Sequence, residues 1–345
     1  MNVLAAGEKP ADHVLITGGA GYIGSLLTGL LLERGCRVTV VDSLLFGGES
    51  LLAHWHHPRF RLVKADVCEP DCIVPLLDTA GSERTVVVHL AAIVGFPACQ
   101  ALGEQASRRF NVDATRLVFE QSEEAGVDRL VFSSTYSNYG HAPDGKPVTE
   151  DSPLHPQSLY AETKIASEQF LLDHAKDANT APVVLRFATL FGISPRTRFD
   201  LIVNQFALEA LTRRKLVIYQ RGYARAFVHV RDVCDAILLA LGAPDETVRG
   251  HVFNVGGDEG NATKDEIVGL VQKHIRNVEV EYKDLSFGGD MRDLQVSFAK
   301  IRDVLKFVPR ISIESGVCEV RDAIETGLLG QPGDRRYRNA EFIVQ

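Results

Sequence analysis

Short apolar runs alternate along the first half of the chain with longer segments in which apolar residues recur every three or four positions. Runs of five to seven residues rich in Val, Ile and Leu are typical of strands buried on both faces of a sheet. Six of them are predicted as strands, at residues 13–17, 37–42, 60–64, 85–89, 129–133 and 182–187. Helical spacing predicts helices between them, at about 22–34, 70–79, 104–125 and 158–177.

This alternation predicts the fold class. Parallel strands joined by helices form right-handed crossovers, and helices then cover both faces of the sheet. The sequence therefore predicts an α/β protein with a doubly wound parallel sheet, the Rossmann arrangement.

The regular alternation of predicted strands and helices ends at about residue 190. Residues 191–200, which follow, are rich in Gly, Pro and Arg. Strand-like runs at 227–230 and 252–255 could rejoin the main sheet. The remaining elements indicate a cap, with a helix at 201–213, a strand at 216–219, a helix at 263–276 capped by Thr263, and a small mixed unit at 298–330. We expect a Rossmann domain at 12–190 plus about 226–257, a smaller interleaved cap at 191–225 and 258–330, and arms at 1–11 and 332–345.

Charge narrows the classes of partner. The chain has 345 residues, with 37 Lys and Arg against 45 Asp and Glu, and a net charge of −8. This balance provides no general attraction for nucleic acid or anionic lipid, so an anionic ligand must be held by local donors. No apolar run approaches the ~18 residues of a membrane span, and the N-terminus does not resemble a signal peptide. The six cysteines lack the spacing of a metal site, so we expect no metal and a cytoplasmic protein with reduced thiols.

A glycine-rich turn stands between the first predicted strand and helix. Its glycines at positions 18, 21 and 24 allow a tight bend and let backbone N–H groups approach a pyrophosphate at the helix N-terminus. Asp42 ends the next strand, where a carboxylate can accept both ribose hydroxyls of NAD and repel the extra phosphate of NADP. Asp66 follows the third strand and either faces the adenine or caps a helix.

Tyr160 and Lys164 are four residues apart, on one face of the helix predicted from Ser158. A phenol has a pKa near ~10, and an ammonium one turn away lowers that pKa, which makes Tyr160 a usable base. The fifth strand ends in the hydroxyl residues Ser133, Ser134 and Thr135, which could share a proton between a substrate oxygen and the phenol.

Together these motifs resemble an extended short-chain dehydrogenase/reductase of the nucleotide-sugar epimerase/dehydratase family. The matching stretches are TGGAGYIG at 17–24, HLAA at 89–92, FSSTYSNYG at 132–140, YAETK at 160–164, RFATLFG at 186–192 and AFVHVRD at 226–232. The resemblance implies a Rossmann domain that carries NAD and a smaller C-terminal domain for a nucleotide-diphosphate sugar. It also implies a homodimer formed through a four-helix bundle, here with the helices near 104–125 and 158–177.

The resemblance implies roles for individual residues. Thr135, Tyr160 and Lys164 correspond to the catalytic set. The implied cofactor-binding residues are Gly18, Gly21, Tyr22, Ile23, Gly24, Asp42, Asp66, Val67, Leu90, Ala91, Ala92, Ser133, Tyr160 and Lys164. The implied substrate-binding residues are Thr135, Tyr160, Thr189, Asn204, Arg225 and Arg292. The two arginines suit a diphosphate because the guanidinium fork matches phosphate oxygens.

Departures from the family pattern narrow the reaction. Family dehydratases place Asp-Glu directly after the catalytic Thr, and family decarboxylases keep a Glu two positions after it. Tyr136 and Ser137 stand there in this chain, so the carboxylate that both reactions need is absent. What remains is an NAD-dependent epimerase, with C4 the expected position and a transient 4-keto sugar, or an NAD(P)H-dependent 4-ketosugar reductase. A dinucleotide-binding sensor without catalysis is the third alternative.

The sugar and its nucleotide base stay open. Thr189 replaces the Asn often seen in this stretch of the family, which weakens or moves a diphosphate contact. Arg196 and Arg198 lie near the expected substrate mouth and could read a phosphate or a substrate carboxylate, so a uronic-acid sugar remains an alternative.

Overall fold

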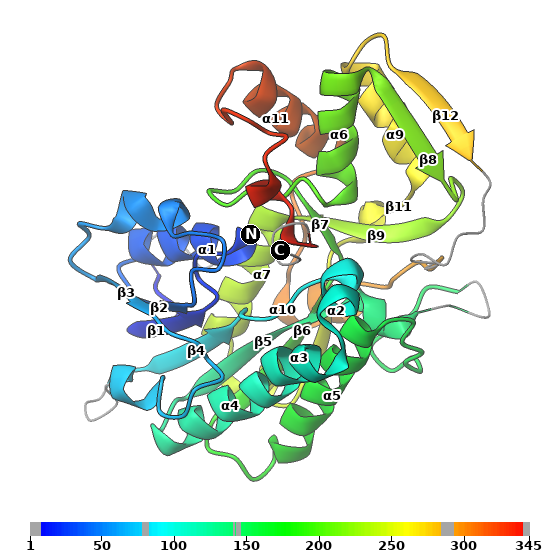
Figure 1. Ribbon diagram of the computed structural model, residues 1–345. Helices are drawn as coiled ribbons and strands as arrows, with labels where there is room; N and C mark the ends of the chain where they lie inside the picture. The colour runs from blue at the N-terminus through cyan, green and yellow to red at the C-terminus, as the bar shows by residue number, and fades with distance from the viewer. Residues whose placement is uncertain (1–7, 78–82, 141, 143–145, 284–292, 341–345) are drawn as a thin grey trace.

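The computed structural model describes residues 8–77, 83–140, 142, 146–283 and 293–340 (Figure 1). Its centre is a seven-stranded sheet in the order β10-β6-β5-β4-β1-β2-β3. Every neighbouring pair in it is parallel. The strands are β1 (His13–Thr17), β2 (Arg37–Asp42), β3 (Phe60–Lys64), β4 (Thr85–His89), β5 (Arg129–Thr135), β6 (Ala181–Phe187) and β10 (Val252–Val255). The predicted doubly wound parallel sheet is therefore confirmed.

Helices cover both faces of this sheet. One face carries α1 (Tyr22–Glu33) and α7 (Val230–Gly242), and the other carries α4 (Ala114–Glu124) and α5 (Leu159–His174). Successive β1 side chains enter opposite cores, with Val14 in the same apolar cluster as Leu27 of α1 and Leu15 in the same cluster as Val118 of α4. Burial on both faces explains why the strand sequences are apolar at nearly every position.

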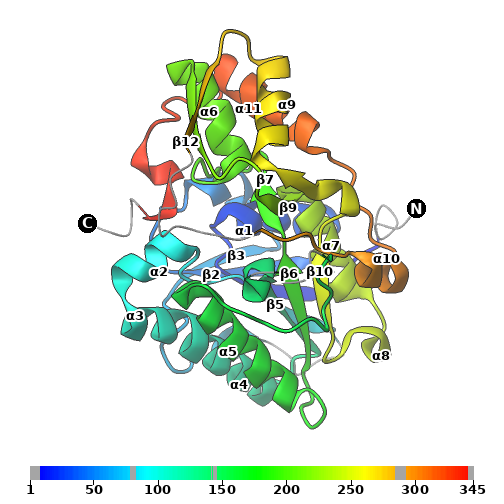
Figure 2. The same cartoon turned by 90° about the vertical axis from the view of Figure 1, so that its right-hand side faces the viewer.

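A smaller cap stands above the carboxyl ends of the strands (Figure 2). Three helices and two small sheets surround a separate apolar core that includes Phe191, Val203, Val271 and Val317. The cap helices are α6 (Ile202–Arg213), α9 (Lys264–His274) and α11 (Ile313–Glu325). One sheet contains β7 (Thr189–Phe191), β9 (Ala224–His229) and β11 (Asn261–Thr263), and the other contains β8 (Lys215–Tyr219) and β12 (Glu279–Lys283).

Several predicted elements differ in the structure. Of the two runs expected to rejoin the main sheet, only β10 does so, whereas β9 pairs with β7 and β11. The helix predicted at 70–79 is a single 3-10 turn, η2 (Val74–Leu76), and residues 78–79 lie outside the described residues. The helix predicted at 104–125 is divided into α3 (Glu104–Arg108), a π-helical turn η3 (Arg109–Asp113) and α4. The unit at 298–330 is helical, with α10 (Ala299–Leu305) before α11.

The remaining short elements complete the connections. They are η1 (Glu49–His54), α2 (Phe96–Leu102), η4 (Tyr136–Tyr139), α8 (Asp245–Val248), η5 (Asp258–Gly260) and η6 (Arg335–Tyr337). Thr263 caps α9 as predicted, and Glu266 completes a capping box with it. None of the helices in the described ranges combines the length and apolar character that crossing a membrane requires.

Candidate active site

The glycine turn lies directly against the loop that follows β4. Gly18 has φ +73°, and a Cβ there would stand 2.7 Å from the Ala91 nitrogen. A Cβ on Gly24 would stand 2.5 Å from the Gly18 oxygen. These positions therefore require glycine, and the packing places the uncapped N-terminus of α1 at the cavity, where a helix attracts phosphate.

Asp42 is fixed beside this turn at the end of β2. Its carboxylate accepts hydrogen bonds from the backbone N–H groups of Ala20 (2.9 Å) and Leu44 (2.8 Å). Burial raises the pKa of Asp42 above its usual range. Because the carboxylate lines the cavity next to the glycine turn, its position fits the adenosine ribose of a dinucleotide.

One cavity of about 1210 Å³ runs from the glycine turn to the underside of the cap. Most residues expected at the site line it: Gly18, Gly21, Tyr22, Ile23, Gly24, Asp42, Asp66, Val67, Leu90, Ala91, Ala92, Ser133, Thr135, Tyr160, Lys164, Thr189 and Arg225. Arg292 lies outside the described residues. The cavity therefore brings together residues from positions 18 to 225, although their individual roles remain predictions.

The proton-handling residues meet where β5 ends and α5 begins. Lys164 donates a hydrogen bond from Nζ to the Ser133 carbonyl (2.8 Å) and lies over the Phe132 ring, 4.6 Å from its centroid. Burial lowers the pKa of Lys164 to about 8. The Thr135 hydroxyl donates to the Ser137 hydroxyl (2.9 Å), and Tyr160 lines the same cavity. A phenol, an ammonium and a chain of hydroxyls can move one proton at a sugar oxygen.

Glu168 extends the Tyr160–Lys164 row of α5 by one more turn, and the sequence pattern did not single it out. Its carboxylate forms a buried ion pair with Arg186 of β6 (2.6 Å) and accepts a hydrogen bond from the Ser134 hydroxyl. Because Ser134 precedes Thr135 on β5, these contacts fix α5 against the strand that ends at the cavity. A Glu four residues after the Lys was the available sequence signal.

Asn204 braces a loop instead of lining the cavity. This loop, residues 192–200, follows β7. The Asn204 side chain accepts from the Gly192 nitrogen (2.9 Å) and donates to the Gly192 (3.0 Å) and Arg198 (2.8 Å) carbonyls. Asn204 is buried under the loop and is not in the described lining of the cavity, so its expected contact with the substrate stays a prediction.

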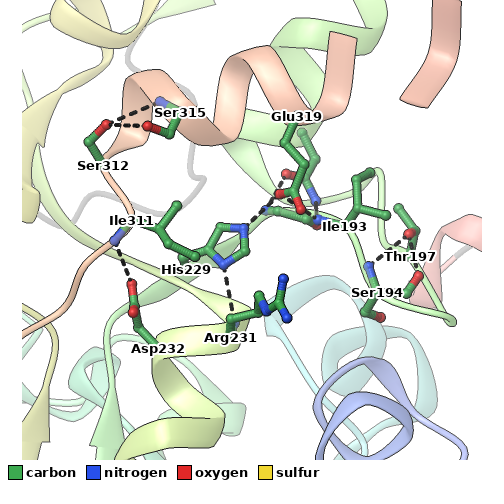
Figure 3. Close-up of polar contacts among 12 residues, drawn as sticks. Ile193, Ser194, Thr197, His229, Arg231, Asp232, Ile311, Ser312, Ser315 and Glu319 are labelled. Carbon is green, nitrogen blue, oxygen red and sulfur yellow. Dashed lines mark hydrogen bonds and ion pairs between the residues drawn. The ribbon is translucent and has the colours of Figure 1, made fainter. Parts of the chain in front are cut away.

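The other side of the 192–200 loop is held by α11 (Figure 3). Glu319 accepts from the Ile193 nitrogen (3.2 Å) and contacts Nε2 of His229 (2.7 Å). Nδ1 of His229 accepts from the Arg231 nitrogen (3.2 Å), so the proton of a neutral imidazole is on Nε2 and donates to Glu319. The loop is therefore positioned by α6 and α11, which belong to the cap.

The two loop arginines have different surroundings. Arg198 forms a two-pronged pair with Asp200 (3.0 and 2.8 Å), which neutralises its charge. Arg196 lies over the Phe46 ring, 4.1 Å from its centroid, and donates from Nη1 to the Asn339 side chain (2.6 Å). The end of the described chain, expected to be an arm, therefore contributes Asn339 to the cavity lining.

The fold and this cavity define a dinucleotide-binding enzyme with a tyrosine and a lysine of one helix in the cavity lining. The chain belongs to the NAD dependent epimerase/dehydratase family, whose sequence model matches residues 14–256. It is therefore an NAD-dependent epimerase or a related oxidoreductase. The glycine cradle and the Asp42 carboxylate fit this cofactor.

Individual relatives cover most of the chain. It is 28% identical over 316 residues to a UDP-glucose 4-epimerase of Corynebacterium glutamicum, across 86% of this chain and 90% of that protein. It is 29% identical over 329 residues to a dTDP-glucose 4,6-dehydratase of Streptomyces niveus, across 89% and 91%. The crystal structure of UDP-glucuronic acid 4-epimerase from Bacillus cereus, in complex with UDP-glucuronic acid and NAD, matches 91% of this chain and 99% of that chain, with a TM-score of 0.80 and 25% identity.

Proposed function

We propose that the protein is an NAD-dependent nucleotide-sugar epimerase that inverts C4 through a transient 4-keto sugar. The observation that carries this proposal is the distribution of carboxylates around the cavity. In the described part of the lining they are Asp42, Asp66 and Asp200. Asp200 is paired with Arg198, and the other two follow β2 and β3.

Asp42 and Asp66 are remote from Thr135, Tyr160 and Lys164. β2 and β3 stand three and four strands from β5, which corresponds to about 14 and 19 Å at the usual strand spacing. Removal of water across C5–C6 or loss of a carboxylate needs an additional acid or base at the sugar. Next to Thr135 this cavity offers hydroxyls, because Tyr136 contacts Thr189 (2.9 Å) and Ser137 contacts Thr135. This chemistry supports epimerisation over dehydration and over decarboxylation.

In this reaction, some residues of the chain transfer the proton and others bind the cofactor and the substrate. Tyr160 takes the proton of the C4 hydroxyl, Thr135 relays it, and the Lys164 ammonium stabilises the phenolate. When bound, NAD would supply the reversible hydride transfer that this reaction needs. The glycine turn and Asp42 hold the cofactor, and Arg225 binds the sugar-nucleotide diphosphate under the cap.

Tyr160→Phe tests this assignment. The kcat for C4 epimerisation should fall by about 10²–10⁴-fold, the usual contribution of a general acid–base group, while nucleotide-sugar affinity changes little. Tyr219→Phe is the matched control, because Tyr219 is exposed on β8, away from the cavity lining. A Tyr160→Phe enzyme within twofold of wild type would remove Tyr160 from the mechanism.

The alternative reactions predict different handling of the cofactor. An epimerase should retain NAD through purification and convert each 4-epimer into the other without added cofactor. A 4-ketosugar reductase should exchange its NAD(P)H and consume it stoichiometrically, and a sensor should show no turnover. Because relatives include UDP-glucose and UDP-glucuronic acid 4-epimerases, UDP-sugars head the substrate panel, followed by dTDP-, GDP- and CDP-sugars.

We also propose a cytoplasmic homodimer that joins α4 and α5 of two copies in a four-helix bundle. Partly exposed apolar side chains on these helices, Leu117, Ile165 and Phe170, support the proposal. Ile165→Glu should shift the sedimentation coefficient from a dimer to a monomer, and an unchanged coefficient would contradict this interface.

A further inference from the structure

Arg196 extends from the cap toward the cofactor end of the cavity. It belongs to the 192–200 loop, yet its guanidinium lies on Phe46, four residues after Asp42. The carboxylate of Asp42 is close enough to attract the Arg196 charge. Only 8% of Arg196 is exposed, and the residue lines the cavity. The arginine therefore covers the β2 end of the site, away from the reacting end at Tyr160.

One nitrogen of the Arg196 guanidinium has a hydrogen-bond partner among the described residues, and the other two have none. Nη1 donates to Asn339, whereas the buried Nε and Nη2 atoms have no hydrogen-bond partner among the described residues. Buried donors without partners are costly, and more so when they carry charge. Nε and Nη2 form one edge of the guanidinium, where two parallel N–H groups match two oxygens of a phosphate. This edge is therefore a preformed site for an anion.

We propose that the Nε–Nη2 edge of Arg196 binds the diphosphate of NAD from the cap side, opposite the glycine turn. The contact with Phe46 and the proximity of Asp42 favour the cofactor over the sugar nucleotide as the source of the anion, because Asp42 ends β2 and Phe46 follows it, on the glycine-turn side of the cavity. The neighbouring Arg198 is neutralised by Asp200, whereas Arg196 has two buried donors without a partner among the described residues. The proposal rests on NAD binding in this cavity and is independent of C4 epimerisation.

The C-terminal segment, residues 335–340, fixes the position of the loop that carries Arg196. The Asn339 nitrogen donates to Asp200 (3.2 Å), and the Tyr337 carbonyl accepts from the Phe199 nitrogen (2.8 Å). The rings of Phe199 and Tyr337 meet edge to face, 5.5 Å apart. Asn339 is thus a positioning residue for Arg196, 143 residues away in sequence.

Binding from both sides has a consequence for turnover. NAD held between the glycine turn and Arg196 leaves only when the 192–200 loop moves, so the cofactor stays bound between catalytic cycles. An enzyme that returns the hydride to its own substrate needs such retention.

The test is calorimetric titration of the full-length protein with NAD, ADP, adenosine and UDP. Arg196→Gln should weaken NAD and ADP by about 10–100-fold, the range expected for losing hydrogen bonds to a charged group, and leave adenosine and UDP within twofold. It should also speed NAD release from the holoenzyme by a similar factor. Arg336→Gln is the matched control. Arg336 is an exposed arginine of the C-terminal segment that contacts Arg196, and it is paired with Asp334.

Two further variants separate binding from folding. Arg196→Lys keeps the buried charge and should bind ADP with an affinity between those of wild type and Arg196→Gln. Asn339→Ala should weaken ADP less than Arg196→Gln does, and Asn339→Asp, which keeps the acceptor, should restore affinity.

Three results would overturn the proposal. Unchanged ADP affinity in Arg196→Gln and Arg196→Lys would exclude Arg196 from the diphosphate. Weakened UDP with unchanged ADP would assign the anion to the substrate. Equal losses for ADP and adenosine would show that Arg196 only shapes the adenosine pocket. None of these results depends on whether the enzyme epimerises C4.

Discussion

Lys164→Met should change how the stability of the NAD-free protein depends on pH. Burial lowers the pKa of Lys164 from 10.5 to about 8. At roughly 1.4 kcal/mol per pH unit, this fall corresponds to about 3 kcal/mol that the folded protein spends to keep the ammonium charged at pH 7. Methionine has a similar shape and no charge, so it removes this cost, although it also removes the hydrogen bond to the Ser133 carbonyl.

The direction in which stability changes with pH follows from the number of protons that the folded and unfolded states bind. Between pH 8 and 10.5 the unfolded chain keeps the Lys164 proton while the folded protein releases it, so the stability of the lysine protein rises with pH in this window. The methionine protein lacks this contribution. Its stability relative to the lysine protein should therefore fall by about 3 kcal/mol from pH 7 to 10.5.

Urea unfolding at four pH values across this window measures the difference. Both proteins should carry Tyr160→Phe, so that no ionisable phenol stands one helical turn from Lys164 in the comparison. Lys273→Met is the control, since Lys273 is 61% exposed in its ion pair with Glu314 and should give a nearly flat difference. A Lys164 difference as flat as that control would refute the lowered pKa.

Three other changes test the site and the cap. Asp42→Ala should relax the preference for NAD over NADP in affinity measurements, and unchanged selectivity would remove Asp42 from the cofactor site. Gly24→Ala should abolish NAD binding in calorimetry, because its methyl group would meet the Gly18 oxygen at 2.5 Å, whereas Gly222→Ala meets nothing within 4 Å and should bind normally. Thr263→Ala should lower the free energy of unfolding by about 1 kcal/mol in urea with kcat unchanged, and wild-type stability would contradict the role of the capping box.

Much of the fold could be predicted from local patterns in the sequence. The six predicted strands all lie in the central sheet, because a strand buried on both faces must be apolar at nearly every position. The Tyr160–Lys164 pair depends only on helical spacing, and the glycine spacing reflects the backbone geometry of a seven-residue turn, although Gly18 also lies against the Ala91 backbone. Such features are visible in sequence because their causes lie within one element or one turn.

Other features depended on how distant elements meet. The run at 227–230 has the composition of a main-sheet strand, but β9 pairs with β7 and β11, since a strand's partner is decided by packing between layers. The same holds for the Glu168–Arg186 ion pair, which joins α5 to β6.

What the sequence by itself determined was the class of fold, the glycine turn between β1 and α1, and the placement of Tyr160 and Lys164 on one helix. Only the tertiary structure decided that Asn204 braces a loop and that Asn339 reaches Arg196 from the far end of the chain. The physical reason is that contacts between residues so far apart leave no periodic pattern in the sequence. They exist only once the sheet and the cap have packed together.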